Sequence, residues 1–521
     1  MSPVVRSSRL GALLVTAAMA LSACSGGAAG SAGAKASDTL RLAFGTDMQV
    51  PDPDIFYEIE GNAVVTSVYE GLVRYKANSA EIEPWLAQKY IVSKDGLTYT
   101  FTLRSGVKFH DGTALDSAAA KASFQRRLNV NSAPAYMLAD VVKMATPDPQ
   151  TFVVTLRKPV SAFLDYLAAP YGPKMVSPTA VAAHAGKDFA QSWLKTHDAG
   201  TGPFAISQFQ LAKQYELSRF AGYWGKKASF NTVLISIIPN ISTQQLELQS
   251  GQLSMIQHGL TTTDIQSFRS NPQFTVQQFP SLYKTFIFLN PKKGVFANQA
   301  VREAFRGALD RKQLVSEVFG DRATPSTQVY PAGELPEPAA STVSTVDPSK
   351  LKTLVATLPN KKVDFAYVTD DTSNQRMAEL VQTKLAAAGL DVTVRGIPIA
   401  QAFDLPNQPA QAPDAVLATL NPDAVHPDTY ARIFMTTKGS LNWLGCSVPA
   451  ADAALDKGLH ATNPAAVRAD YASAGALLAQ SACWLDLADV KETVVARKSI
   501  GGFVHQLPTL NTVRLADLTT G

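Results

Sequence analysis

The chain has 521 residues, of which 46% are hydrophobic and 17% are charged, and its formal net charge at pH 7 is +4. This length suffices for two or three domains of roughly 100 to 200 residues each. Long runs of Lys or Arg do not occur, so electrostatics gives no support to nucleic-acid binding. After the N-terminal region, the apolar runs have the length of strands and are too short to cross a bilayer.

The N-terminus has the pattern of an export signal. Two arginines precede an almost uncharged stretch, 10–21, which is shorter than the roughly 20 residues of a membrane-spanning helix. The tetrapeptide Leu-Ser-Ala-Cys that ends at Cys24 resembles a bacterial lipobox, in which the cysteine carries the lipid. We therefore predict a signal peptide over 1–23, lipidation of Cys24 and a flexible Ser/Gly/Ala-rich tether over 24–37, which would hold the protein on the outer face of the cell membrane. The alternative is an ordinary cleaved signal with an incidental cysteine.

Two further cysteines, Cys446 and Cys483, belong to a chain that is predicted to be exported to a compartment where thiols oxidise. They could form a disulfide, and the alternative is two separately buried thiols. The seven histidines show no paired spacing, and the cysteines are too few and too far apart for a zinc site. We assign no metal site and no cofactor.

Side-chain periodicity predicts several elements. Residues 99–103 alternate between apolar and polar side chains, which predicts a half-buried strand, and an alanine-rich helix is expected around 117–128. Apolar residues at helical spacing predict one helix over 298–319, capped by Asn298. The Pro-rich stretch 325–348 predicts a long surface loop.

The clearest unit is a strand, a helix and a second strand with short connections. The strands are expected at 363–368 and 391–397, and the helix at 374–388 with Gly389 as its C-terminal stop. This order predicts two parallel strands joined by a crossover helix. An α/β fold follows from this pattern.

A series of sequence blocks runs in order through nearly the whole chain, at 71–75, 81–87, 95–113, 200–204 (Gly-Thr-Gly-Pro-Phe), 222–225 (Gly-Tyr-Trp-Gly), 248–251, 289–290, 301–305 and 309–311. Together these blocks resemble the family 5 extracellular solute-binding proteins, the dipeptide, oligopeptide and nickel receptors of ABC importers. Many blocks at family spacing are more specific than one short motif. Several blocks are typical of scaffold: we expect Trp85 to pack in the interior, and Arg302 to lie on a solvated helix face with Glu303 or Asp310.

The resemblance implies a two-lobed periplasmic-binding-protein-like fold of the class II type, with an extra domain inserted near the N-terminus. The first lobe is expected to comprise 38–69, 197–278 and 486–521. The inserted domain would be 70–196 and the second lobe 279–485. A ligand would be enclosed between the lobes, and their closure would be the signal that the permease reads.

The resemblance also implies a ligand anchor. Peptide receptors of the family carry an aspartate that pairs with the peptide's ammonium group, three residues before a block that resembles Asp-Pro-Asp-Asn-Phe. Here 426–430 is His-Pro-Asp-Thr-Tyr, so Asp423 falls at the anchoring position. An enclosed ammonium needs a fixed anion, because an unpaired buried charge is very costly. The alternative is that Asp423 only stabilises an Asn-Pro turn.

Three more residues are carried over from the family as ligand contacts. Asn442 and Trp443 begin a block, 442–449, that matches one approaching the ligand from the second lobe, and Trp443 is predicted to act as a lid. Tyr136 falls near a tyrosine of the inserted domain that lines the cleft. Ordinary packing is the alternative for each residue.

The resemblance thus implies a lipid-anchored substrate-binding component of an ABC importer that captures a small peptide or peptide-like solute. Its partners would be the ABC permease with its ATPase subunits, and the protein itself would be a monomer. A receptor for a nickel chelate, haem or sugar and a non-transport envelope lipoprotein are the alternatives. An enzyme is not expected, since the sequence has no Gly-x-Ser-x-Gly elbow, no His-Glu-x-x-His pair and no phosphate loop.

Overall fold

The computed structural model describes residues 38–335, 342, 345–369 and 371–521. Cys24, the predicted signal peptide and the predicted tether lie outside these described residues. The described residues, from Asp38 onward, belong to one compact unit. Within the described ranges, no helix combines the length and apolar character needed to span a bilayer.

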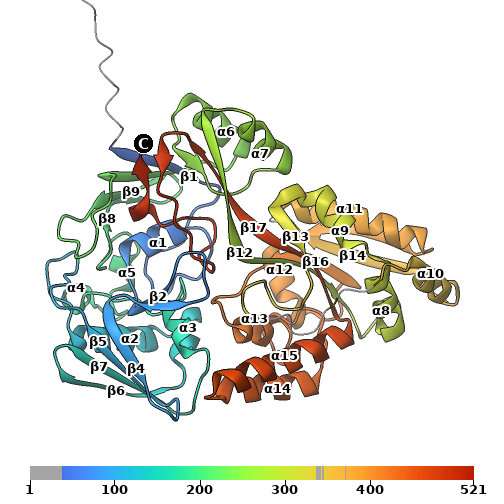
Figure 1. The fold of residues 1–521 in the computed structure, drawn as a ribbon, viewed down its shortest axis with the longest axis horizontal. Coiled ribbons are helices and arrows are strands. Elements are labelled where there is room, and N and C mark those ends of the chain that lie inside the picture. Colours follow the sequence, from blue (N-terminus) through green and yellow to red (C-terminus); the bar gives the residue numbers. More distant parts are fainter. Residues whose placement is uncertain (1–37, 336–341, 343–344, 370) are drawn as a thin grey trace, which may run out of the picture. The chain divides into compact units, whose positions relative to one another are not determined.

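A four-stranded sheet, which we call sheet 1, has the strand order β1-β10-β9-β8 (Figure 1). Strands β1 and β10 are parallel, and the other neighbours are antiparallel. Buried Val233 and Ile235 alternate along β10 with less buried residues, as a sheet with one covered face requires. The strands and helices of this region are β1 (Thr39–Phe44), α1 (Asn62–Val68), β8 (Phe204–Gln210), β9 (Gln214–Arg219), β10 (Thr232–Ile237), α6 (Ile241–Ser250) and α7 (Thr262–Arg269).

A second four-stranded sheet, sheet 2, is antiparallel with the order β4-β5-β7-β6. The predicted strand at 99–103 is confirmed as β5, and the predicted helix at 117–128 is confirmed as α2, whose N-cap Asp116 accepts a hydrogen bond from Ala119 N. The elements here are β2 (Val73–Tyr75), β3 (Ile82–Pro84), β4 (Ala87–Val92), β5 (Thr98–Leu103), α2 (Ser117–Val130), a 3-10 helix (Ala133–Leu138), β6 (Val141–Asp148), β7 (Thr151–Leu156), α3 (Phe163–Ala168), α4 (Pro178–His184) and α5 (Gln191–Leu194).

The largest sheet, sheet 3, has seven strands in the order β11-β17-β12-β16-β14-β15, with β13 also paired to β17. The predicted strand-helix-strand unit is confirmed: β14 and β15 are parallel neighbours joined by α11, and Gly389 after the helix has a φ of 97°. The elements are β11 (Met255–Ile256), β12 (Phe274–Leu289), β13 (Ala323–Pro325), β14 (Lys362–Val368), α11 (Thr372–Ala387), β15 (Asp391–Ile397), β16 (Ala415–Leu420) and β17 (Trp484–Arg497).

Side chains on the two faces of sheet 3 belong to two separate hydrophobic clusters. Ile287 and Leu289 of β12 pack in one cluster, and the alternate residues Phe286 and Phe288 pack in the other. Helices therefore cover both faces, as Figure 1 shows. The covering and connecting elements are α8 (Gln299–Ala308), α9 (Arg311–Phe319), α10 (Pro348–Ala356), α12 (Ile399–Asp404), α13 (Pro427–Phe434), α14 (Pro449–His460), α15 (Pro464–Ser481) and the 3-10 helices Val295–Ala297, Gly320–Arg322 and Leu405–Asn407.

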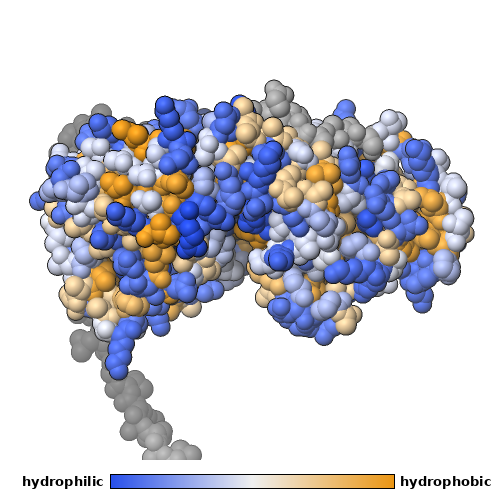
Figure 2. Space-filling model, turned by 90° about the horizontal axis from the view of Figure 1, so that it is seen from below, coloured by the Kyte–Doolittle hydropathy of each residue, from blue (hydrophilic) through white to orange (hydrophobic). Residues whose placement is uncertain are grey.

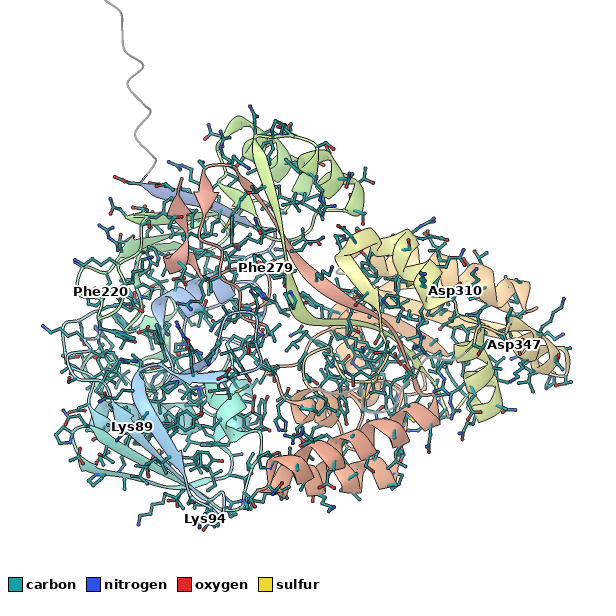
Figure 3. The ribbon with its side chains drawn as sticks, in the orientation of Figure 1. Lys89, Lys94, Phe220, Phe279, Asp310 and Asp347 are labelled. Atoms are coloured by element: carbon teal, nitrogen blue, oxygen red, sulfur yellow. A yellow bond between two sulfur atoms is a disulfide. The ribbon has the colours of Figure 1, made fainter. Side chains whose placement is uncertain are left out.

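Strands β12 and β17 are much longer than their neighbours and pair antiparallel along nearly their whole length. The predicted lobe boundaries at 278/279 and 485/486 fall inside these two strands. Their pairing is irregular between Phe279, which Figure 3 labels, and Tyr283. The chain ends with β18 (Ile500–Gly501), a 3-10 helix (Leu515–Asp517) and β19 (Thr519–Thr520).

The single helix expected over 298–319 is wrong, because the structure has two helices there. Leu309 has an extended backbone that ends α8. Asp310, labelled in Figure 3, then accepts a hydrogen bond from Gln313 N and starts α9. The apolar spacing continues across this break because both helices cover the same sheet, and the predicted cap at Asn298 is confirmed by its bond from Ala300 N.

Two expectations of exposure are also wrong. Arg302 is only 6% exposed, and its guanidinium donates to the carbonyl oxygens of Phe296 and Ser481 instead of facing solvent. The described part of the Pro-rich stretch lacks regular structure after β13, but Ser326 and Tyr330 are buried. Local composition does not reveal burial of this kind, because the groups that cover these residues come from distant segments.

Candidate functional site

Asp423 lies in the turn between β16 and α13, which we call the Asp423 loop (421–426). His426 caps α13 because its ring Nδ1 accepts the Asp428 N–H at 3.2 Å, and Pro427 occupies the first helical turn. Burial lowers the pKa of His426 to about 4, so this ring is neutral at pH 7 and Nδ1 can serve as an acceptor. The end of the loop is therefore held in place by the start of the helix.

Two tyrosine hydroxyls from distant parts of the chain meet the Asp423 carboxylate. Tyr57, before α1, donates to Oδ2 at 2.5 Å, and Tyr136, in the 3-10 helix beside sheet 2, donates to the same oxygen at 2.6 Å. Asp423 is 8% exposed, whereas the two tyrosines keep 40% and 37% of their surface accessible. The structure thus brings predicted site residues Asp423 and Tyr136 together, and each tyrosine retains accessible surface beside a buried carboxylate.

Burial dominates the electrostatics of this group. It raises the pKa of Asp423 above its ordinary value, and the hydrogen bonds from Tyr136 and Tyr57 partly oppose that rise. The pKa values of Tyr57 and Tyr136 are raised by burial and by the nearby Asp423 charge, so both remain hydroxyl donors at neutral pH. A buried carboxylate of this kind is stabilised by a cation that enters the same space.

The Asp423 loop makes a second contact with the N-terminal part of the chain. Val425 N donates to the Tyr75 hydroxyl at 3.0 Å, and that hydroxyl donates to Asp165 Oδ1 at 2.8 Å. Burial raises the pKa of Asp165 to about 7. Two independent contacts therefore join the loop after β16 to the regions of sheets 1 and 2.

Further contacts join sheet 2 to the end of α14. Ser161 N donates to Leu459 O at 2.7 Å, and His460 Nδ1 lies 2.7 Å from Pro159 O. These contacts lie outside the Asp423 loop. Figure 2 shows the surface hollowed between the left-hand block and the right-hand block, with polar residues predominating and apolar ones scattered among them.

Asn442 and Trp443 are placed in the interior beside sheet 3. The Asn442 amide donates to the carbonyls of Thr436 and Cys446. Trp443 is 1% exposed, its ring packs against those of Phe288 and Phe434, and its indole Nε1 has no hydrogen-bond partner among the described residues. These contacts are those of packing residues, and the structure brings neither side chain to Asp423 by a hydrogen bond.

Cys446 and Cys483 are joined as a disulfide in the structure, with their Cα atoms 6.3 Å apart. The bond links the loop after Trp443 to the residue before β17. Among the described residues, no group of His, Cys, Asp and Glu side chains is arranged to hold a metal ion.

A second buried carboxylate, Glu70, was not predicted from the sequence. Its Oε1 accepts from Trp85 Nε1 at 2.7 Å and from Tyr223 OH at 2.8 Å. Its Oε2 accepts from Thr201 Oγ1 at 2.9 Å and from Trp224 Nε1 at 3.1 Å. The sequence blocks around 71–75, 84–86, 200–204 and 222–225 therefore converge on one carboxylate. Trp85 is half-buried there and contributes a hydrogen bond in addition to packing.

Tyr57 and Tyr75 were also missed. Tyr57 lies in an irregular segment with no periodicity, and no local pattern separates it from other aromatic residues. Tyr75 ends a short strand, and its role depends on Val425, 350 positions away in the chain. The signal that could have found Glu70 was its position next to the family block 71–75.

With this geometry established, comparison with known proteins identifies the family. The model of the bacterial extracellular solute-binding proteins, family 5 middle, matches residues 81–442, which is well over half of the chain. The chain belongs to this family. The prediction of a non-enzymatic solute-binding protein is therefore confirmed.

Two curated relatives of this family 5 protein have named ligands. A probable D,D-dipeptide-binding periplasmic protein, DdpA, of Escherichia coli K12 is 26% identical over 476 residues, covering 90% of this chain and 91% of that protein. The glutathione-binding protein GsiB of Salmonella paratyphi A is 32% identical over 301 residues, covering 57% of each protein.

Solved structures confirm the predicted fold. The periplasmic binding protein DppA of Helicobacter pylori, in complex with the peptide STSA, has a TM-score of 0.79 at 22% identity, covering 93% of this chain and 98% of that chain. NikA of Brucella suis, in complex with Fe(III)-EDTA, has a TM-score of 0.81 at 21% identity, covering 93% of this chain and 100% of that chain. At these identities the likeness establishes the α/β fold alone.

Proposed function

We propose that this family 5 protein is the lipid-anchored substrate-binding component of an ABC importer, and that it captures a small peptide or peptide-like solute. The observation that carries the proposal is the buried Asp423 carboxylate, bonded by Tyr57 and Tyr136 from two other parts of the chain. In the proposed role, Asp423 binds the solute's ammonium group while the tyrosines hold the carboxylate in position.

The arrangement of donors supports an ammonium ligand. Within the described part of the chain, both hydroxyl donors use Oδ2 of Asp423, and neither supplies a positive charge. A carboxylate has about four acceptor positions, so Oδ1 retains capacity for a charged donor. Burial disfavours the isolated anion, and an ammonium group would offset that cost by a charge-assisted hydrogen bond.

The relatives support the ligand class. DdpA and GsiB are named for a D,D-dipeptide and for glutathione, and both of these ligands carry a free α-ammonium group. The structural likeness to NikA keeps a metal chelate as the alternative solute. Because no metal-ligating cluster exists among the described residues, a chelate would have to bring its own metal ligands.

The deciding experiment compares a peptide with its N-acetylated form by isothermal titration calorimetry. Glutathione and a D,D-dipeptide are the first probes. The wild type should bind the free amine much more tightly, and Asp423→Asn, which keeps the shape and removes the charge, should lose about 2 to 5 kcal/mol of binding free energy.

Asp364→Asn is the matched control. Asp364 lies in β14 as a partly exposed ion pair with Arg395, so its replacement removes one carboxylate charge far from the Asp423 loop in sequence. The Asp364→Asn variant should bind the peptide with the same affinity as the wild type. Equal affinity of the wild type for the free and acetylated peptides would eliminate ammonium recognition and favour the chelate or another non-peptide solute. Native mass spectrometry of protein from its own host would then identify a co-purifying ligand.

Ligand-dependent closure is part of the proposal. Contacts from Tyr57 and Tyr75 to the Asp423 loop, and from Ser161 to the end of α14, would form when the lobes close and break when they open. Small-angle scattering should therefore give a smaller radius of gyration with a saturating ligand than without it. Uptake into vesicles that carry the permease would separate transport from sensing.

The lipid anchor is tested at Cys24. Cys24→Ala should release the protein from the membrane fraction or block its maturation, because the lipid would supply the apolar attachment. Mass spectrometry of the wild-type N-terminus provides the independent measurement. An unlipidated N-terminus together with unchanged membrane association would overturn this part of the proposal.

A further inference from the structure

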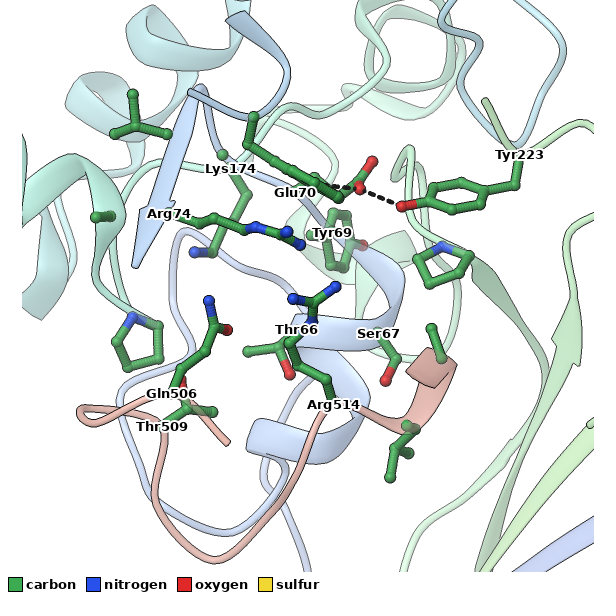
Figure 4. Close-up of a pocket in the computed structure, with 18 residues that line it drawn as sticks. Thr66, Ser67, Tyr69, Glu70, Arg74, Lys174, Tyr223, Gln506, Thr509 and Arg514 are labelled. Atoms are coloured by element: carbon green, nitrogen blue, oxygen red, sulfur yellow. Dashed lines mark hydrogen bonds between the residues drawn. The ribbon is translucent and has the colours of Figure 1, made fainter. Parts of the chain in front are cut away.

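A cavity separate from the Asp423 loop lies where α1, β2 and the C-terminal segment meet. Its lining comes from α1, β2, the loop after α3 and residues 506–516, together with Trp85, Pro203 and Tyr223 (Figure 4). The cavity measures about 80 Å³. One water needs roughly 10 to 15 Å³ on the same measure, so the space suffices for a group of about five heavy atoms.

Three cationic side chains extend into this cavity. Figure 4 shows the Arg74 and Arg514 guanidinium groups near the middle of the cavity and the Lys174 side chain beside them, from three different segments. The Arg74 and Arg514 Cζ atoms lie 3.1 Å and 5.7 Å from the centroid of the same Trp85 ring. The two guanidinium groups are therefore neighbours on one aromatic side chain.

The existing partners leave most of these donors available. Arg74 uses Nε for Glu83, Arg514 pairs through Nη2 with Asp517, and Lys174 donates one bond to the carbonyl of Ala169. Glu70 also lines the cavity, but its two oxygens already accept four hydrogen bonds. Three cations and one carboxylate thus line the space, and that carboxylate has no free acceptor position for the cations.

Burial and neighbouring positive charges disfavour the charged forms of two of these side chains. Burial, and then the Arg127 charge, lower the pKa of Lys174 to about 7, and the Glu70 charge only partly opposes them; this lysine is 7% exposed. Burial and the Arg514 charge lower the pKa of Arg74. A buried ammonium without a carboxylate partner and two neighbouring guanidinium groups would all be stabilised by an anion placed between them.

We propose that this cavity binds a small tetrahedral oxyanion, of the phosphate or sulfate class, through Arg74, Lys174 and Arg514. Guanidinium groups bind such oxyanions through paired N–H donors, and the lysine contributes a compact point charge. The bound anion joins β2, the loop after α3 and the C-terminal segment. Its expected effect is to stabilise the packing of these three segments against one another. The residues that line the cavity do not include any from 279–485, so the site is distinct from the solute site.

The test measures thermal unfolding and calorimetric binding of the full chain with inorganic phosphate and with sulfate, against chloride at equal ionic strength. The midpoint temperature should rise saturably with phosphate and sulfate but not with chloride. Arg514→Gln and Lys174→Met should each raise the dissociation constant for phosphate about tenfold or more. Arg376→Gln is the matched control, because Arg376 is an exposed residue of α11 and should leave phosphate binding unchanged.

The outcomes separate this site from the solute site. Asp423→Asn should keep the full phosphate response, and Arg514→Gln should keep its peptide affinity. Lys174→Met should also unfold at a higher temperature than the wild type in chloride, because it removes a buried cation. If Lys174→Met does not fold, the phosphate affinity of Arg514→Gln tests the proposal, since the Arg514 side chain is partly exposed and its replacement should be tolerated. An equal response to chloride, or a phosphate response that survives in the cavity variants, would overturn the proposal.

Discussion

Glu70 and Asp423 are both buried carboxylates whose pKa is raised by burial, yet they differ in how their oxygens are used. Glu70 accepts four hydrogen bonds, two on each oxygen, from side chains beside sheets 1 and 2. Asp423 accepts two hydroxyl bonds, both on Oδ2. The first carboxylate is saturated by the protein, and the second retains acceptor capacity.

We interpret this difference as one between a structural role for Glu70 and the proposed binding role of Asp423. When a buried carboxylate accepts all the hydrogen bonds it can, fixed donors offset the cost of removing it from water, and the carboxylate holds those donors together. Glu70 holds Trp85 and Trp224 in this way, with their ring centroids 4.9 Å apart. An anion with free acceptor capacity, such as Asp423, would be stabilised further by a cationic ligand. The number of hydrogen bonds that a buried carboxylate accepts therefore says more about its role than the extent of its burial does.

The largest effect is expected at Glu70. In Glu70→Gln, an NH₂ group replaces one carboxylate oxygen. This group cannot accept hydrogen bonds, so the two buried donors that bonded to that oxygen lose their partner. We expect the free energy of unfolding in urea to fall by roughly 2 to 5 kcal/mol. The fraction that folds should bind peptide with unchanged affinity. A loss of peptide affinity without a loss of stability would reverse the comparison and make Glu70 part of the solute site.

A smaller effect on affinity is expected at Tyr136. Tyr136→Phe removes one hydroxyl bond to the charged acceptor, and peptide binding should weaken by about 1.5 to 3 kcal/mol. The hydroxyl also lowers the pKa of Asp423, so its loss raises that pKa further. Because ammonium binding requires the ionised carboxylate, affinity is lost as the pH falls through this pKa, and in the variant that loss should begin at a higher pH. Calorimetric titrations at a series of pH values measure the shift, and an unshifted pH profile would contradict it.

Asp423→Asn should make the ligand-free protein more stable at neutral pH. The native carboxyl has a raised pKa, so the native state holds a proton more tightly than the unfolded state, and stability falls as the pH rises through that pKa. Above that pKa the full penalty of ionising the buried carboxyl group is present, and the variant removes it. We expect a gain of about 0.5 to 2 kcal/mol, the range of single stabilising substitutions. The gain should vanish below the ordinary carboxyl pKa of 3.8, and a variant that is less stable at pH 7 would show that Asp423 is a structural residue.

The smallest effect is expected away from both carboxylates, at His460. This side chain joins the end of α14 to Pro159 O, so it stabilises the contact between sheet 2 and the sheet 3 region without reaching Asp423. His460→Ala should weaken peptide binding by about 0.5 to 1.5 kcal/mol through a less stable closed state. The acetylated and free peptides should be affected equally. A selective loss for the free peptide would place His460 in the solute site.

Local sequence determined the regular elements where one pattern covered a whole element. The alternation in β5 and the strand-helix-strand unit of β14, α11 and β15 follow from side-chain periodicity, since a strand and a helix repeat their faces every 2 and about 3.6 residues. The same reasoning wrongly predicted one helix in place of α8 and α9, because both helices bury apolar side chains at helical spacing. The cap at Asp310 was the local signal that separates them.

The sequence by itself determined the family, the α/β class and the position of Asp423 three residues before the block 426–430, because these depend on motifs and on neighbours in the chain. Only the tertiary structure brought Tyr136 and Tyr57, 287 and 366 positions away, onto that carboxylate. It also buried Arg302 and gathered four separate sequence blocks around Glu70. The physical reason is that burial and hydrogen-bond saturation depend on which distant segments pack together, and no local pattern records that.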